Sequence, residues 1–116
     1  MRIEVLKSKI HRCTVTEANL DYVGSISIDA ALMCVAQLCE FEKVHVLNVT
    51  NGNRLITYAI RAPENSGEIC INGAAAHLAK PNDKIIIVSY CSILKKEIDS
   101  HQPQIIHVDH NNKTTL

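Results

Sequence analysis

Short runs of β-branched and apolar residues recur along this chain, whereas only one segment has the spacing of an amphipathic helix. The strongest run, Lys84–Cys91, contains three consecutive isoleucines and a valine, which is typical of a central strand. Residues 29–40 form the helical segment, because apolar residues share one stripe and Asp29 can cap the first turn. The stripe consists of Leu32, Val35, Leu38 and Cys39. Many short strands with one helix predict a mainly β, α+β fold: a small compact barrel with one or two short helices, not a sheet of βαβ units.

The remaining elements follow from the same local signals. Asn51-Gly52 predicts a type I′ hairpin turn, because Asn-Gly tolerates positive φ at both central positions. We expect one or two helical turns at 74–79 and a loosely held polar tail at 109–116. No repeat or linker interrupts the chain, so we expect a single domain spanning residues 1–116. The other expected strands are Arg2–Lys7, Ile10–Val15, Ser25–Ile28, Val44–Val49, Arg54–Arg61, Glu68–Ile71 and, at an edge, Ile105–Val108.

Charge and cysteine usage narrow the class of protein. Twelve basic and twelve acidic residues cancel, which gives no support for a nucleic-acid binder or a membrane-surface protein. No segment approaches the ~20 apolar residues of a membrane span, and the N-terminus lacks a secretory pattern. We therefore expect a cytoplasmic protein. The five cysteines are odd in number and lack CxxC spacing, which favours small buried apolar residues over a metal or redox site.

The dipeptide Gly24-Ser25 alone indicates only a turn, but three other stretches supply groups that suit an anionic substrate carrying an amine. Asn48–Ile60 contributes a cation, a hydroxyl and a phenol on one arm of the hairpin. Asn72–His77 joins a glycine to small residues that open a helix, where unpaired backbone N–H groups can bind a carboxylate or an oxyanion. Residues 9–11, Lys-Ile-His, add a second cation and a titratable ring.

Together, residues 22–25 (Tyr-Val-Gly-Ser), Asn48–Ile60 and Asn72–His77 resemble the aspartate 1-decarboxylase family, the pyruvoyl enzymes that make β-alanine for pantothenate biosynthesis. The resemblance holds in order and spacing from the N-terminus to about Tyr90 and fades beyond Cys91. It implies L-aspartate as the substrate, a double-psi β-barrel, and a homotetramer with active sites between subunits. It also implies a lyase that needs neither a metal nor pyridoxal phosphate.

The resemblance further implies that the chain is a zymogen that cleaves itself. The Ser25 hydroxyl would attack the carbonyl carbon of Gly24, where the absent Cβ permits strained dihedrals and close approach. Residues 1–24 and 25–116 would then be separate chains, and Ser25 would become a covalent pyruvoyl group that forms a Schiff base with the substrate amine. By the same resemblance Thr57 assists cleavage, and His11 is a second candidate for this role.

The remaining site residues are assigned through the resemblance as well. Tyr58 is the proton donor to the carbon that loses CO₂. Arg54 is suited to a bidentate grip on a carboxylate, and Lys9 is the second cation for the substrate. The other residues assigned to substrate binding are Thr57, Gly73, Ala74, Ala75, Asn72 and Tyr22.

Strand geometry limits how these residues can meet. Alternation places Arg54 and Tyr58 on one face of a strand and Thr57 on the other. Arg54 and Tyr58 also lie about 13 Å apart along an extended strand. One strand therefore cannot gather all three side chains around one atom. A bulge, a strand end or a site shared between subunits would resolve this, and the resemblance to a family with sites between subunits favours the shared site.

Each assignment has a plainer alternative. Arg54 and Lys9 are also typical of solvated strand residues, Tyr58 of a half-buried aromatic, and His11 and His77 of hydrogen-bonded scaffold. For the whole chain, one alternative is a non-catalytic β-barrel that binds a carboxylate metabolite or a protein partner. A weaker alternative is a metal-binding protein that uses the C-terminal histidines, which are His101, His107 and His110.

Overall fold

The computed structural model describes residues 1–115 and contains eight strands and one α-helix in that range. No helix among these residues has the length and apolar character needed to cross a membrane. The strands are β1 (Arg2–Thr14), β2 (Glu17–Asn19), β3 (Ser25–Asp29), β4 (Lys43–Asn48), β5 (Arg54–Ala62), β6 (Ile69–Asn72), β7 (Lys84–Leu94) and β8 (Gln104–His107). The helices are α1 (Ala30–Ala36) and two 3-10 segments, η1 (Gly73–His77) and η2 (Lys95–Ser100).

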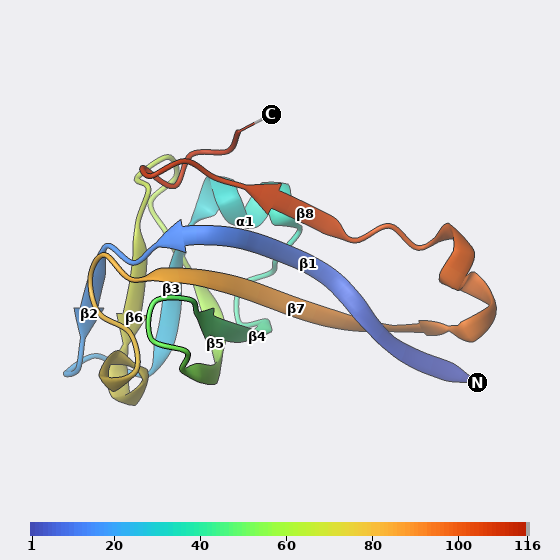
Figure 1. The fold of residues 1–116 in the computed structure, drawn as a ribbon, viewed down its shortest axis with the longest axis horizontal. Helices are drawn as coiled ribbons and strands as arrows, with labels where there is room; N and C mark the ends of the chain where they lie inside the picture. Colours follow the sequence, from blue (N-terminus) through green and yellow to red (C-terminus); the bar gives the residue numbers. More distant parts are fainter. Residues whose placement is uncertain (116) are drawn as a thin grey trace.

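The strands form one continuous sheet in the order β2-β6-β3-β5-β4-β7-β1-β8. β7 pairs with β1 and β4 and is therefore central, as its isoleucine run predicts. β8 pairs parallel with β1 at one edge, and β3 pairs parallel with β5. Figure 1 shows β2, β6 and β3 running across the direction of β1 and β7, so that the sheet curves strongly. The predicted mainly β, α+β fold with a small barrel-like sheet is confirmed.

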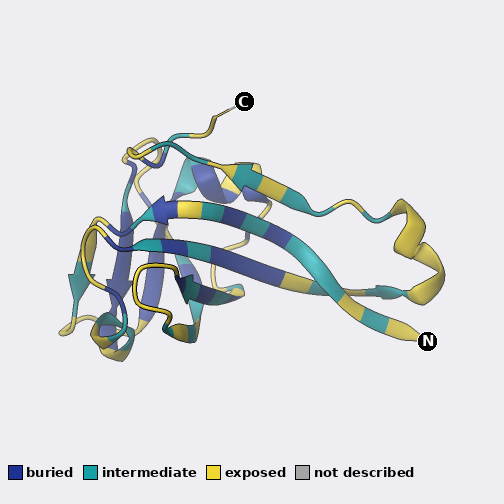
Figure 2. Cartoon of the chain, viewed as in Figure 1, coloured by how far each residue is buried: buried dark blue, intermediate teal, exposed yellow. Residues whose placement is uncertain are grey.

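β1 is longer than the sequence pattern suggested. Residues 2–7 and 10–15 were expected as two strands, but the structure has one strand of 13 residues that pairs with β7. Register shifts at Leu6/Ser8 and at Ile10/Cys13 accommodate the irregular alternation, because a β-bulge absorbs an extra residue without ending the ladder. The far ends of β1 and β7 project as an arm whose residues are intermediate or exposed in Figure 2.

The hydrophobic core lies at the end of the molecule opposite this arm, where the strands cross and α1 packs onto them (Figure 2). Its largest fully buried side chains come from β1, β3, α1, β4, β6 and β7, and from the turn after β1. They are Ile10, Val15, Ile26, Ile28, Leu32, Met33, Val44, Val46, Ile69, Ile71, Ile85 and Ile87. β3 and β6 are buried along their whole lengths, so the residues that begin β3 are held in a rigid part of the fold.

Helix α1 is shorter than predicted and turns a different face to the core. Asp29 does cap it, since its carboxylate accepts from the Ala31 N–H at 2.8 Å. Gln37 then adopts a left-handed conformation with φ of 58°, and the N–H of Leu38 bonds to Met33, which closes the helix as a Schellman motif. The buried helical residues are Leu32, Met33 and Ala36, so the predicted stripe through Val35 and Cys39 is wrong.

The β4–β5 hairpin is confirmed, but its turn is not type I′. Gly52 has φ of +80°, whereas Asn51 has no positive φ, and five residues separate the two strands. The Asn48 carboxamide organises the loop by accepting from the N–H groups of Thr50 and Asn51. An Asx turn therefore replaces the two-residue turn that Asn-Gly alone indicates.

The C-terminal tail is held firmly over its described part. Asn112 is 1% exposed, accepts from the Thr14 N–H at 2.7 Å and donates to the carbonyls of Thr14 and Gly67. Val108 and Thr114 form a β-bridge. The expectation of a loose tail is therefore wrong for residues 109–115, because the polar side chains find backbone partners; Leu116 lies outside the described residues.

The cysteines divide by position. Cys13 and Cys70 are buried as predicted, whereas Cys34 is exposed on α1 and Cys39 is exposed beyond its end; Cys91 is half-buried. All five are free thiols.

Candidate active site

Ser25 occupies the first position of β3, between β5 and β6, at the boundary between an exposed segment and the core. Ser25 is 2% exposed, whereas Val23 is 76% exposed. The peptide bond between Gly24 and Ser25 therefore joins an accessible loop to a fixed strand. On one side of this bond the nucleophile Ser25 is fixed in the core, and on the other side Gly24 belongs to the exposed loop.

The Ser25 hydroxyl is held by Asn72 of β6, its direct partner in the antiparallel register. The Asn72 Nδ2 donates to the Oγ of Ser25 at 2.9 Å and to the Oγ of Ser27 at 3.1 Å. The Sγ of Cys70 donates to the Oδ1 of Asn72 at 3.1 Å. The Ser25 hydroxyl itself donates to the Val23 carbonyl at 3.5 Å. All four side chains are buried, so this chain of hydrogen bonds is shielded from water.

Gly73 follows Asn72 and lies against Gly24. Its φ of +69° is in the left-handed region, and a Cβ there would stand 2.7 Å from the Gly24 Cα and 2.8 Å from the Gly24 N. Gly24 itself has an ordinary φ, and a Cβ there would meet no other part of residues 1–115 within 4 Å. The glycine that backbone conformation and close approach require in this structure is therefore Gly73, and the expected role of Gly24 in permitting strained dihedrals during attack stays a prediction.

β5 brings two of the predicted residues toward the Gly24-Ser25 bond. Ile26 of β3 pairs with Ala59 of β5 in a parallel register. Ser25 and Tyr58 each precede this pair by one residue, so they lie at the same end of the β3–β5 ladder, and Thr57 is the next residue along β5. Both Tyr58 and Thr57 are half-buried, which suits groups that must meet a substrate without losing their fixed orientation.

Arg54 and Lys9 are not brought to Ser25 within one chain. Arg54 begins β5, is exposed, and lies about 13 Å from Tyr58 along the strand. Lys9 pairs with Val88 of β7, which pairs with His45 of β4, which in turn pairs with β5. Three strand spacings of about 4.8 Å separate Lys9 from β5, or about 14 Å.

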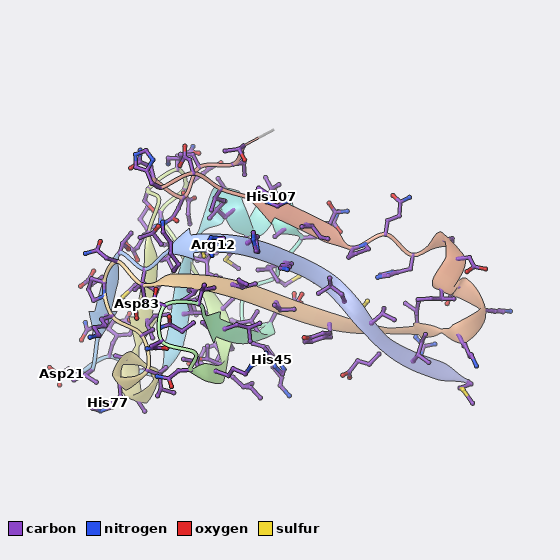
Figure 3. All side chains as sticks on the ribbon, viewed as in Figure 1. Arg12, Asp21, His45, His77, Asp83 and His107 are labelled. Carbon is purple, nitrogen blue, oxygen red and sulfur yellow. The ribbon has the colours of Figure 1, made fainter. Side chains whose placement is uncertain are left out.

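His11 lies with Lys9 on β1 and faces β8. Its ring meets that of His107 edge-on at 5.5 Å between centroids, and its Nδ1 is buried with no hydrogen-bond partner among the described residues. Burial lowers the pKa of His11, and the neighbouring Lys9, His107 and Arg12 lower it further. Figure 3 shows His107 above the strand that carries Arg12, well away from the labelled His77 of η1.

A cavity of about 270 Å³ lies beside the Ser25 network. It contains Tyr22 and Asn72, which the sequence predicted, and also Ser27, Cys70 and Arg61, which it did not. Ser27 pairs with Cys70 as Ser25 pairs with Asn72, so the four side chains form a cross-strand ladder on one face. The polar alternation Ser25-Ile26-Ser27 was the available signal. The rest of the lining is Glu17, Asn19, Ile60, Ala62, Pro63 and Glu68.

Cys70 is a protonated thiol at neutral pH. Burial raises its pKa to about 11, and the nearby carboxylates of Glu17 and Glu68 act in the same direction. A protonated thiol is a hydrogen-bond donor, which agrees with its contact to the carboxamide oxygen of Asn72.

The first residues of η1 have the arrangement expected of an oxyanion-binding turn, although the segment is a 3-10 helix of five residues. Asn72 occupies the N-cap position in an extended conformation but makes no capping hydrogen bond, since its side chain is engaged with Ser25. Gly73, Ala74 and Ala75 thus present N–H groups that lack partners within the helix. Ala74 is exposed.

The C-terminal histidines lie on separate contacts. The Nε2 of His101 is 2.6 Å from the Leu6 carbonyl oxygen, His107 meets His11, and His110 is exposed. Within residues 1–115 no three His, Cys, Asp or Glu side chains are placed to hold a metal ion together.

The fold and the site define a small barrel-like protein in which a buried serine, fixed by a carboxamide, follows an exposed glycine. A family model described as aspartate decarboxylase matches residues 1–115, and the chain belongs to that family. The match includes residues beyond Cys91, so the sequence expectation that the resemblance fades there is wrong.

Curated relatives agree with this assignment over nearly the whole chain. Aspartate 1-decarboxylase of Caldicellulosiruptor saccharolyticus is 58% identical over 113 residues, which is 97% of this chain and 88% of that protein. Aspartate 1-decarboxylase of Clostridium botulinum strain Loch Maree is 55% identical over 112 residues, with the same coverages of 97% and 88%. Aspartate 1-decarboxylase 1 of Gloeobacter violaceus is 53% identical over 109 residues, or 94% of this chain and 92% of that protein.

Proposed function

We propose that this protein decarboxylates L-aspartate to β-alanine and CO₂ after it has cleaved itself between Gly24 and Ser25. Family membership and the names of the relatives support the reaction. The observation that carries the proposal is the position of Ser25: its buried hydroxyl is fixed by Asn72 directly after a glycine that lies against Gly73.

The cleavage is chemistry of the chain's own residues. The Oγ of Ser25 forms a bond to the carbonyl carbon of Gly24, the C–N bond breaks, and the Ser25 nitrogen takes up a proton, which leaves an ester. Loss of the Ser25 Cα proton with departure of the Gly24 carboxylate then gives dehydroalanine, and water converts it to a pyruvoyl group with release of ammonia. The products are residues 1–24 and residues 25–116.

The residues at this position fit a pyruvoyl group at the start of β3. The new ketone oxygen would lie on the former Cα of Ser25, where the nitrogen was, and the former Cβ would become the methyl carbon. Asn72 loses the Oγ as its partner in this change, so its Nδ2 would be an N–H donor available beside the group. Gly73 leaves backbone-sized room on the other side of the cut. When present, the group supplies the carbonyl that joins the substrate amine and takes up electrons as CO₂ leaves.

The side chains beside Ser25 have separate tasks in the proposal. Tyr58 donates its phenolic proton to the substrate carbon that lost CO₂. Thr57, the neighbour of Tyr58 on β5, assists cleavage through its hydroxyl. Arg54 and Lys9 bind the substrate carboxylates, and His11, on the same strand as Lys9, is the second candidate for assisting cleavage.

The proposal requires more than one copy of the chain. Arg54 lies about 13 Å along the strand from Tyr58, and Lys9 lies on β1, three strands away from β5 in the sheet, so neither cation is placed beside Ser25 by the strand pairings of one chain. A neighbouring copy can supply them, and exposed apolar side chains at Ile56 and Phe41, 60% and 72% exposed, are suited to contacts between copies. We propose a homotetramer with sites between subunits.

A cytoplasmic location completes the proposal. Five free thiols are the form of cysteine that a reducing compartment maintains.

Intact-mass measurement tests the proposed function. The purified protein should consist of two fragments, the larger beginning at position 25 with a blocked N-terminus, and should release CO₂ from L-aspartate. Ser25→Ala should be folded, uncut and inactive. An uncut wild-type chain that still makes β-alanine, or an active Ser25→Ala variant, would show that the pyruvoyl mechanism is wrong.

A further inference from the structure

The carboxamide of Asn72 must face in one direction for the Ser25 contact to form, and the two ends of a carboxamide are chemically different. Its Nδ2 end meets two serine oxygens, those of Ser25 and Ser27. Its Oδ1 end meets one side chain, the thiol of Cys70, at 3.1 Å. A serine hydroxyl can either donate or accept, so the two serines do not select an orientation by themselves.

Cys70 does select one. Its thiol remains protonated near neutral pH because burial raises its pKa to about 11, and a protonated thiol has a hydrogen to donate. If the carboxamide were reversed, the thiol would face an NH₂ group and could offer it only its sulfur, a weak acceptor, while the thiol hydrogen would lose the carboxamide oxygen. Both serine hydroxyls would then have to share one carboxamide oxygen.

The orientation matters for the serine that is cut. With Nδ2 toward it, the Ser25 Oγ acts as an acceptor, and its own proton is directed at the Val23 carbonyl, on the side of the segment that is cleaved. With the carboxamide reversed, the Ser25 proton would be directed at Asn72 instead. The reversed state thus directs the hydroxyl proton away from the Val23 carbonyl and changes the orientation of the hydroxyl beside the bond that is cut.

We propose that Cys70 is a positioning residue for self-cleavage: its thiol holds the Oδ1 of Asn72, so that the Nδ2 holds the Ser25 hydroxyl in the attacking direction. This inference rests on the proposed function. Cys70 acts through Asn72, whose Oδ1 accepts from its thiol. Ser27 supports the same orientation by accepting the second Nδ2 hydrogen.

The test follows the rate of cleavage after synthesis of the full chain. Wild type, Cys70→Val and Cys70→Ser are made in a cell-free system, synthesis is stopped, and the cut fraction is followed by intact mass. Cys70→Val removes the donor, and we expect cleavage about three- to tenfold slower, the range for loss of one hydrogen bond. Cys70→Ser restores a donor and should cleave within about twofold of wild type.

Thermal unfolding separates positioning from a packing role. A buried hydroxyl is less favourable than a buried isopropyl group on a strand, so Cys70→Ser should be the less stable of the two variants. The inference therefore predicts that the less stable variant cleaves faster. If cleavage rates instead follow the unfolding midpoints, Cys70 contributes only packing and the inference is wrong.

Cys13 supplies the matched control, because it is also a buried strand thiol but donates weakly to the Ile85 carbonyl, away from Ser25. Cys13→Val should cleave at the wild-type rate. Should Cys70→Val not fold, Cys70→Ala gives the same comparison, and failure of both to fold would overturn the inference. A wild-type chain that stays uncut would show that the proposed function is wrong. A wild-type chain that is cut, at the same rate as Cys70→Val, would show only that this inference is wrong.

Discussion

Gly73 approaches Gly24 so closely that a Cβ on Gly73 would stand 2.7 Å from the Gly24 Cα. The backbone at the start of η1 therefore packs directly beside the peptide bond that we propose is cut. Any side chain at Gly73 must push the loop that carries Gly24 away from Ser25. The size of the side chain at position 73, in the turn after β6, therefore affects the position of the bond that is cleaved.

The first prediction concerns this contact. We expect Gly73→Ala to block or strongly slow cleavage and to cost about 1–3 kcal/mol of unfolding free energy, because it adds a clash to a left-handed backbone. Gly52→Ala is the control, since Gly52 has φ of +80° but open space around it. It should lose about 1–2 kcal/mol and still be cut fully. Intact mass and thermal unfolding check both; equal cleavage in the two variants would rule out the role of the contact.

The second prediction concerns Asn72. Asn72→Ala should slow cleavage by about tenfold or more, since it removes the group that holds the Ser25 hydroxyl. Asn112→Ala is matched to it, because Asn112 is also a buried asparagine with three hydrogen bonds, but to Thr14 and Gly67. That variant should unfold at a lower temperature yet be cut when folded. Slow cleavage in both would mean that Asn72 acts only through stability.

The third prediction separates cleavage from decarboxylation. Tyr58→Phe should be cut as fully as wild type, since the phenol is assigned to the substrate and not to the peptide bond. Its kcat for CO₂ release should fall by about 100-fold, within the range for loss of a general acid. Cleavage is followed by intact mass and turnover by β-alanine formation. Normal turnover would remove Tyr58 from its assigned role.

The fourth prediction tests whether Arg54 acts across subunits. Arg54→Ala and Tyr58→Phe, each inactive alone, should regain about a quarter of wild-type activity when co-expressed in equal amounts, because one site in four would draw an intact residue from each chain. Tyr58→Phe with Ser25→Ala is the control: these two residues lie side by side in one chain, so that pair should stay inactive. Activity absent from both mixtures would place Arg54 and Tyr58 in one chain's site.

The fifth prediction concerns acid stability through Asp29. Burial acts to raise the pKa of Asp29, but N–H groups of Gly67, Ala31 and Asn65 and the charge of Lys113 outweigh it, and the net pKa is lowered. A lowered folded-state pKa means that the native state binds fewer protons. The stabilisation is therefore present above the unfolded pKa of about 3.9 and is lost as pH falls below it.

Asp29→Asn should accordingly lower the unfolding free energy at pH 7 by about 1–3 kcal/mol, and the unfolding midpoint with it. The decrease of the midpoint as the pH falls below about 4 should also be smaller than in wild type. Thermal unfolding from pH 3 to pH 7 measures both. A wild-type midpoint that is constant over this range would contradict the prediction.

Local sequence patterns were sufficient to predict those strands and helices whose formation depends on residues close together in the sequence. The isoleucine run of β7 needs two apolar neighbours wherever it lies, so its central position was predictable. The end of α1 was not, because Gln37 takes a left-handed conformation that its type does not require. The tail also eluded sequence reasoning, since the partners of Asn112 lie 45 and 98 residues away.

Those residues of the candidate site that belong to recognisable sequence motifs could be predicted. Ser25, Asn72 and Tyr22 meet at one place, and Tyr58 follows from the parallel register of β3 and β5. Cys70 and Ser27 were missed because neither carries a motif, and their importance arises from the pairing of β3 with β6. Lys9 and Arg54 remain predictions, since they reach Ser25 only if copies of the chain associate.

The long ladder between β1 and β7 affects how the cleaved protein would unfold and refold. Cleavage after residue 24 would leave β1 clasped between β7 and β8, so the short piece stays bound without any covalent tie. Unfolding would then separate two polypeptides that began as one. Regaining the native form would become a second-order encounter that depends on concentration and competes with aggregation, which makes activation a one-way event for each molecule.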